Sequence, residues 1–325
     1  MQCPKCHFEH PLQTTSCLRC GVVFAKYSAE TQASVSPPAE PIPPDPETVL
    51  VVEPRLSPQE LETERSEAKR EMMYRWFALP GALILARWLV GVTSFTHLIR
   101  SWTHEGGHAV AGWLCGMPAL PSAGVTSVPD RSRIFGLLAI AALGCAVYFA
   151  WRRRRWFWMV VSAVCMVLMI IGNLESEFQS RGFVYFFGEG GSFALATALM
   201  ATFYARPSSQ IVRQQLRWAL LLFGAIAFMD GYQIWFGPEH TENLVAQLEY
   251  NDEDARGPGD VFQLTQLYGW KAGQVQDRTR GMVYLGFTAM AAMYGAGLYS
   301  AIQRKKELES EPEAEGIANS AAAGD

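Results

Sequence analysis

The sequence predicts an all-α polytopic membrane protein of about six transmembrane helices, preceded by a small cysteine-rich module. Apolar runs are the first observation, because hydrophobic residues make up 50% of the 325 residues and concentrate in the middle of the chain. A helix needs about 20 apolar residues to cross a bilayer. We therefore expect spans, completed by their flanks, at roughly 77–100, 134–150, 156–172, 191–205, 218–236 and 281–301.

Positive charges in the loops are the second observation, and they orient the predicted spans. By the positive-inside rule, short loops rich in arginine and lysine lie in the cytoplasm. We expect an integral, multi-pass protein whose N- and C-termini are both cytoplasmic, with the acidic loop 237–280 on the opposite side. The clusters that predict this topology are Arg152, Arg153, Arg154 and Arg155; Arg206, Arg213 and Arg217; and Arg304, Lys305 and Lys306.

The overall charge excludes one class of function. The net charge is −4 and the pI is about 5.9, so the chain lacks the basic excess of a nucleic-acid-binding protein. We expect no nucleic-acid partner and a lipid bilayer as the surroundings. The N-terminus reads MQCPKCHFEH and lacks the basic and apolar stretches of a secretory signal, which agrees with a cytoplasmic N-terminus.

Composition divides the chain into five segments. A cysteine-rich module at 1–27 is followed by a linker at 28–58 that holds eight of the 18 prolines beside many acidic residues. Such a segment buries too little apolar surface to fold, so we expect it to be disordered. A charged juxtamembrane helix at 59–76 then leads to the membrane domain at 77–303. A disordered tail at 304–325 ends the chain.

The path of the chain between Leu79 and Gly116 is the main open point of the predicted fold. This stretch is almost continuously compatible with helix, and at 1.5 Å per residue it would be about 57 Å long. One perpendicular crossing of about 30 Å cannot contain it. The stretch must therefore tilt, break or re-enter, and Pro80-Gly81 and Gly91 are the candidate breaks.

Four paired cysteines predict a structural metal site in the N-terminal module. Cys3, Cys6, Cys17 and Cys20 follow the spacing Cys-x2-Cys-x10-Cys-x2-Cys. Four thiolates bind zinc tetrahedrally and leave no position for water. The segment resembles a short zinc ribbon, which implies a docking surface for a cytoplasmic protein partner. The alternatives are four unrelated reduced thiols or a redox Cys-x2-Cys, although no βαβ pattern surrounds the pairs.

A second metal-type pattern lies beside an apolar run. His104 and His108 stand four residues apart and share one face of a helix, so both can bind one zinc ion. Glu105 follows the first histidine and is placed to act as general base. The alternative is a helix end at the membrane interface whose polar groups are hydrated.

The stretch "HEGGHAVAGWLCG" resembles the zinc-binding helix of the site-2 protease family of intramembrane zinc metalloproteases. This resemblance implies that His104 and His108 bind the catalytic zinc and that Glu105 is the base. The family's third ligand is an aspartate followed by glycine in a later span, which implies Asp230 in Asp230-Gly231. The asparagine and proline that precede this aspartate in the family are missing here.

Other residues remain open as the third ligand. Glu175 and Glu177 end the third predicted span, Glu189 opens the fourth, and His240 follows the fifth. Each of these is also compatible with a hydrated loop position. His97 precedes the HEGGH sequence by more than one helical turn, and we expect it to be a packed or interfacial histidine.

These patterns predict a membrane-embedded zinc metalloendopeptidase with one catalytic and one structural Zn²⁺, acting on membrane protein substrates. The alternative from another class is a non-catalytic zinc-binding adaptor that uses the ribbon to dock a cytoplasmic partner; the presence of Glu105 favours the enzyme. A zinc transporter is disfavoured because the polar residues form one cluster instead of a path. Membrane-anchored ATP-dependent proteases are excluded by the lack of a GxxxxGK[ST] nucleotide-binding loop.

Overall fold

The computed structural model describes residues 58–92, 95–122, 124–205, 209–238 and 259–310. The chain divides into two compact units, Met1–Arg55 and Leu56–Asp325, and all the described residues belong to the second. The predicted ribbon with its four cysteines, nearly all of the linker, His240 and the end of the C-terminal tail lie outside the described residues. Their assignments stay predictions.

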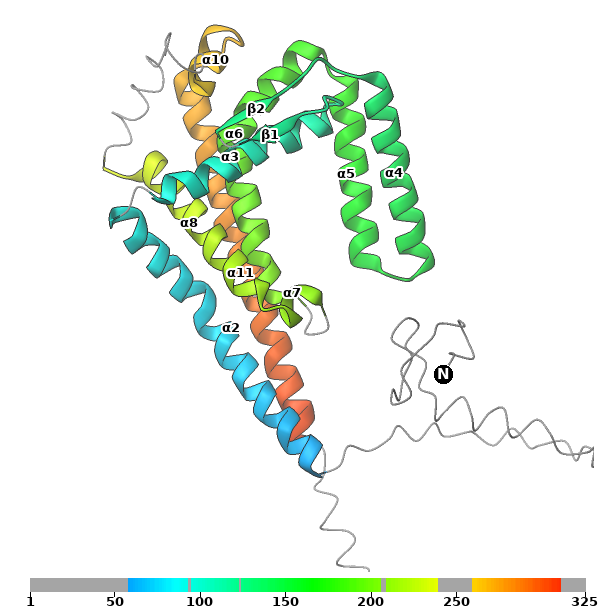
Figure 1. Cartoon of the computed structure of the whole chain (residues 1–325), viewed down its shortest axis with the longest axis vertical. Coiled ribbons are helices and arrows are strands. Elements are labelled where there is room, and N and C mark those ends of the chain that lie inside the picture. The colour runs from blue at the N-terminus through cyan, green and yellow to red at the C-terminus, as the bar shows by residue number, and fades with distance from the viewer. Residues whose placement is uncertain (1–57, 93–94, 123, 206–208, 239–258, 311–325) are drawn as a thin grey trace, which may run out of the picture. The chain divides into compact units, whose positions relative to one another are not determined.

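Six helices of the described part are long and apolar enough to cross a membrane. This confirms the prediction of a helical chain with the character of a multi-pass membrane protein. The fourth of these helices begins at Glu177, well before the predicted 191. The six are α2 (Pro58–Val92), α4 (Arg133–Arg152), α5 (Trp156–Leu174), α6 (Glu177–Ala201), α8 (Leu216–Phe236) and α11 (Ala272–Ser310) (Figure 1).

Smaller elements lie between these helices, and one of them departs from the all-α prediction. Strands β1 (Leu120–Ser122) and β2 (Val125–Ser127) form an antiparallel hairpin. Gly124 in its turn has a φ of 88°, which glycine adopts at little cost. The other small elements are α3 (Phe95–Leu114), η1 (Thr202–Tyr204), α7 (Gln210–Arg213) and α10 (Asp260–Gln266).

Helix α2 runs without interruption through the predicted boundary at residue 76 and through Pro80. A proline has no N–H, so the carbonyl of Trp76, four residues earlier, loses its helical donor. The Tyr294 hydroxyl of α11 donates to that carbonyl at 3.1 Å, so the neighbouring helix replaces the missing bond. The change of helix comes after Val92, close to Gly91, and the HEGGH sequence therefore lies in a separate helix, α3.

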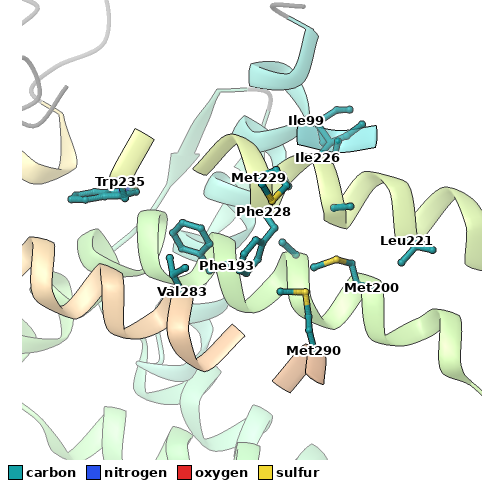
Figure 2. Packing of buried hydrophobic residues seen from close by; sticks show 14 of the residues in the cluster. Ile99, Phe193, Met200, Leu221, Ile226, Phe228, Met229, Trp235, Val283 and Met290 are labelled. Atoms are coloured by element: carbon teal, nitrogen blue, oxygen red, sulfur yellow. The ribbon is translucent and has the colours of Figure 1, made fainter. Parts of the chain in front are cut away.

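Helix α6 is the centre of the larger helical bundle, where it packs against α3, α8 and α11. Figure 2 shows Phe193 and Met200 of α6 beside Phe228 of α8 and Val283 of α11, and all four are buried. The rings of Phe193 and Phe228 meet edge to face with their centroids 5.3 Å apart. Polar groups on α6 are consequently held in an apolar, closely packed setting.

Helices α4 and α5 pair mainly with each other, and Figure 1 shows them as a separate hairpin beside the bundle. Only 11% and 6% of their most apolar windows are buried, so nearly all of their apolar side chains are available to lipid. Arg131, just before α4, donates to the carbonyl oxygens of Cys115 and Gly172 at 3.1 Å. This contact joins the base of the hairpin to the end of α3.

Candidate metal centre

Helices α3 and α6 approach each other through glycines. A Cβ atom on Gly107 would clash with the carbonyl oxygen of Phe187, and one on Gly191 would lie 3.0 Å from the Cα of Gly107. The hydroxyls of Thr103 and Ser192 also meet across this contact at 2.8 Å. Gly107 of HEGGH and Gly191 of α6 therefore let α3 rest on the backbone of α6, which brings the histidines to the face of α6.

Three potential ligand atoms converge at this contact. The Nε2 atoms of His104 and His108 are 3.2 Å apart, and each lies 2.9 Å from Oδ2 of Asp260, the first residue of α10. Ligands at about 2.0–2.2 Å from a tetrahedral zinc are about 3.3–3.6 Å from one another. The triangle is slightly smaller than that, so a small displacement would accommodate a metal ion bound by all three residues.

The hydrogen bond of His108 on its other ring nitrogen fits a metal ligand. Its Nδ1 lies 2.9 Å from the carbonyl oxygen of Val184 in α6. A carbonyl can only accept, so Nδ1 carries a proton, and when the ring loses its other proton to a metal ion the Nε2 lone pair faces the triangle. In His104, the corresponding atom Nδ1 lies 3.5 Å from Oε1 of Glu189, so a carboxylate is close to the ring nitrogen that faces away from the triangle.

The local charge also suits a cation. Among the described residues, Oδ2 of Asp260 is buried and has no directional hydrogen bond, despite its two close histidines. Three carboxylates act on the guanidinium of Arg100 and a fourth acts on His108. With both histidines neutral, one positive against four negative charges leaves three negative charges. Such an excess in an apolar setting is costly unless protons or a metal ion offset it. The four are Glu105, Glu189, Asp230 and Asp260.

Titration of the three central groups follows the same logic. Burial alone would lower the pKa of His108, but the Asp260 carboxylate outweighs this and, with smaller contributions from Val184 and Glu105, raises the pKa to about 9. Burial likewise opposes ionisation of Asp260, yet the two histidines hold its pKa well below the usual range. The triangle thus attracts positive charge, and a bound divalent cation would take the place of the protons.

Glu105 is positioned by the β-hairpin. Its side chain is buried, and Oε2 accepts a hydrogen bond from the Thr126 hydroxyl of β2 at 2.7 Å. The same hydroxyl lies 2.9 Å from the carbonyl oxygen of Glu105. Glu105 follows His104 in the sequence and its charge acts on His108, so the carboxylate belongs to the surroundings of the three grouped ligand atoms without being one of them.

Asp230, the third ligand suggested by the sequence, is not brought to the two histidines. It is buried in α8, where Oδ1 accepts from the Thr96 hydroxyl at 3.1 Å and Oδ2 lies 3.1 Å from Nδ1 of His97. Both partners come from the first turn of α3, two turns before His104. The structure groups Asp260 with His104 and His108 instead.

The other candidate ligands have different partners. Glu189 lies inside α6 rather than at its start, and both of its oxygens are 2.6 Å from Nη2 of Arg100. Trp235 donates to the same carboxylate at 2.9 Å. Glu175 ends α5 with an exposed side chain, and Glu177, at the start of α6, forms an ion pair with Arg181 at 3.1 Å.

Asp260 escaped the sequence analysis because it lies in a segment whose acidic composition resembled a hydrated loop. The spacing of apolar residues directly after Asp260 could have indicated that a packed helix begins there. Val261 and Leu264 are three residues apart and both are buried against the bundle, as expected of one face of a short helix. That apolar contact anchors α10 on α6 and carries its first residue to the histidines.

Comparison with known proteins gives no relative from which a role could be transferred. No protein-family model, curated protein or solved structure matches this chain. The functional argument therefore depends on the geometry of the three converging ligand atoms and on Glu105 beside them.

Gly188 offers a direct test of this geometry. A Cβ atom there would clash with Nε2 of His108 and lie 2.6 Å from Oδ2 of Asp260. Alanine is favoured over glycine in a helix, so Gly188→Ala should leave α6 intact yet occupy the space between the ligands. We expect zinc affinity at this site to fall by at least about tenfold, as when the support of a metal ligand is disturbed.

Equilibrium dialysis of the purified variant measures this change. Gly281→Ala is the matched control, because a Cβ atom on that glycine of α11 meets nothing within 4 Å. If Gly188→Ala retained zinc as tightly as Gly281→Ala does, the space beside His108 would not be where the metal binds.

Proposed function

We propose that the protein is a zinc-dependent endopeptidase that cleaves membrane protein substrates, with His104, His108 and Asp260 as the zinc ligands. The single observation that carries this proposal is the convergence of three ligand atoms beside a buried carboxylate that is not among them. Three protein ligands with a free fourth position are typical of catalytic zinc, whereas structural zinc has four. The proposal replaces Asp230, the expected third ligand, with Asp260.

The residues around the metal position have separate tasks in this mechanism. A zinc ion held there supplies a Lewis acid that polarises the scissile carbonyl and makes water more acidic. Glu105 takes a proton from the attacking water and delivers it to the amine that leaves. The hydrogen bond from Thr126 orients the Glu105 carboxylate, and the Val184 carbonyl holds the ring of His108 in the tautomer that leaves Nε2 free.

The β-hairpin is suited to present a peptide to this centre. Within the described residues, β1 and β2 pair only with each other, so the outer edge of each strand keeps backbone groups free. An extended peptide can add to such an edge through main-chain hydrogen bonds. A substrate helix would have to unwind locally to do so, since only an extended segment exposes its peptide bonds to the hairpin and to Glu105.

The finer assignments made from the sequence belong to this proposal too. The HEGGH helix supports membership of the site-2 protease family. A zinc ribbon formed by the four paired cysteines would add a structural zinc and a docking surface for a cytoplasmic protein. The adaptor alternative keeps both metal sites but needs no base, and the buried, hydrogen-bonded position of Glu105 favours the enzyme.

Zinc dependence of cleavage tests the proposed activity. The full-length protein, reconstituted in vesicles with membrane proteins from cells that lack it, should generate new amino termini detectable by mass spectrometry. A chelator should abolish these termini and added zinc should restore them. Termini that persist unchanged in a metal-free sample would contradict the proposed function.

We further propose that both termini lie in the cytoplasm, as the loop charges indicate. Lys271, at the entrance to α11, and Arg153, between α4 and α5, are both exposed and should lie on opposite sides of the membrane. A membrane-impermeant maleimide applied to intact cells should label Lys271→Cys above the background of the unsubstituted protein and should not label Arg153→Cys. The reverse labelling would overturn this orientation.

A further inference from the structure

A second polar cavity lies away from the metal centre. It has a volume of about 580 Å³ and is lined where the start of α2, the start of α8 and the last turns of α11 meet. Four arginines and two glutamates line it, and a third glutamate, Glu64, pairs with Arg304 at 3.7 Å. The charged groups therefore carry four positive against three negative charges, a net charge of +1. The arginines are Arg70, Arg75, Arg217 and Arg304, and the glutamates are Glu67 and Glu71.

Two of these arginines are buried and share one carboxylate. Nη1 of Arg217 lies 2.9 Å from both oxygens of Glu71, and Nε of Arg75 lies 2.9 Å from Oε1 of the same residue. Arg75 also donates to Ser300 at 2.7 Å. Two buried guanidinium groups against one carboxylate leave one positive charge in excess, which is costly without an anion nearby.

Two buried hydrogen-bond donors of the cavity also lack an acceptor among the described residues. Arg217 is only 5% exposed, and its Nε has no hydrogen-bond partner among the described residues. The buried hydroxyl of Tyr204, which lines the same cavity, also lacks a partner within that part of the chain. Buried donors in folded proteins are nearly always satisfied, and a ligand with acceptor oxygens in this cavity would satisfy both.

An apolar groove of about 480 Å³ adjoins this cavity. Tyr74 and Trp218 line both spaces, and the groove continues along α2 and α8 past Phe77 and Leu221. Its floor is open at Gly81, where a Cβ atom would meet nothing within 4 Å. Both helices are candidate membrane spans. In the orientation proposed above, the groove would face hydrocarbon and the arginine cavity would lie at the interface, where tyrosine and tryptophan are enriched.

We propose that the cavity and groove together bind one anionic phospholipid, with its phosphate among the arginines and one acyl chain in the groove. A phosphate offers several acceptor oxygens and matches the donor geometry of guanidinium groups. The continuous apolar groove favours a lipid over free phosphate, since the latter would leave the groove unused. Basic pockets between membrane helices at the cytoplasmic side are suited to anionic headgroups.

Native mass spectrometry of the full-length protein in detergent tests this assignment. The probes are phosphatidylglycerol, phosphatidylcholine with the same acyl chains, and inorganic phosphate. We expect phosphatidylglycerol to be retained at least about tenfold more tightly than either of the others, because it alone supplies both net charge and chain. Equal retention of the two lipids would show that the site does not distinguish an anionic from a neutral headgroup, and this would contradict the proposal.

Two variants separate headgroup from chain. Arg304→Gln removes one partly exposed guanidinium of the cavity and should weaken phosphatidylglycerol about fivefold, the effect of one basic residue near an anionic headgroup. Arg153→Gln, at the exposed turn between α4 and α5, is the matched control and should change nothing. If Arg304→Gln bound phosphatidylglycerol as tightly as Arg153→Gln does, the arginine cavity would not be the headgroup site.

Gly81→Leu adds a side chain to the groove at a position where its Cβ atom meets nothing within 4 Å. It should weaken phosphatidylglycerol binding by at least about fivefold while leaving phosphate binding unchanged. Gly281→Leu, on an open face of α11, is its control. The lipid assignment would be overturned if phosphate bound as tightly as phosphatidylglycerol and Gly81→Leu had no effect. That result would identify a site for free phosphate.

Discussion

Glu105→Gln is expected to remove peptide hydrolysis while both zinc ions stay bound. Glutamine keeps the size of the side chain and can still accept the hydrogen bond from Thr126, but it cannot take a proton from water. Losing a general base typically lowers a rate by about 10²–10⁴, which corresponds to about 3–5 kcal/mol in the activation barrier. New amino termini of membrane proteins in cells carrying the variant measure the loss.

Two controls accompany this variant. Glu177→Gln alters an exposed glutamate at the start of α6, outside the metal triangle, and should cleave normally. His104→Ala should also be inactive, but with less zinc at the membrane site. If Glu105→Gln supported the same cleavage and complemented a deletion strain as well as the unsubstituted protein, hydrolysis would not be the function and the adaptor interpretation would replace it.

Asp260→Ala is expected to lower the zinc content of the purified protein from about two ions to about one per chain. The substitution removes one of three ligands from the membrane site and leaves the four paired cysteines untouched, so the predicted ribbon should keep its ion. Elemental analysis of the membrane-extracted protein gives this number directly. Cleavage should be lost together with the zinc.

Asp230→Ala separates the two candidates for the third ligand. Asp230 contacts Thr96 and His97 instead of the metal triangle, so its replacement should lower stability through the loss of one buried and one part-buried hydrogen bond while the zinc content stays near two. The opposite pattern, with zinc lost from Asp230→Ala and kept by Asp260→Ala, would restore the ligand that the sequence suggests.

The sequence was a good guide wherever a property is local. The spacing of His104 and His108 defines one helical face, and the length of an apolar run measures whether it can span a bilayer, so the shared face of the two histidines and the membrane character could be predicted. The grouping of Asp260 with these histidines depends instead on how α10 packs against α6, about 150 residues after the histidines. A local spacing pattern cannot predict a contact between residues that are so far apart in the sequence.

The change of direction near Val92 illustrates a second limit. Pro80 carries the stronger local breaking signal, because it removes a helical hydrogen bond. The Tyr294 hydroxyl compensates for that loss, and only the folded bundle shows that this donor is present. A tertiary contact thus outweighed a local preference, and the helix ended at the weaker of the two candidate positions.

The acceptor for Nδ1 of His108 is a main-chain atom, the carbonyl oxygen of Val184. Every amino acid carries that carbonyl, so mutation at position 184 can change the side chain without deleting the hydrogen bond. The tautomer of His108 therefore does not depend on which side chain stands at position 184. A substitution would break this hydrogen bond by shifting the backbone of α6, and the close glycine contact between α3 and α6 opposes such a shift.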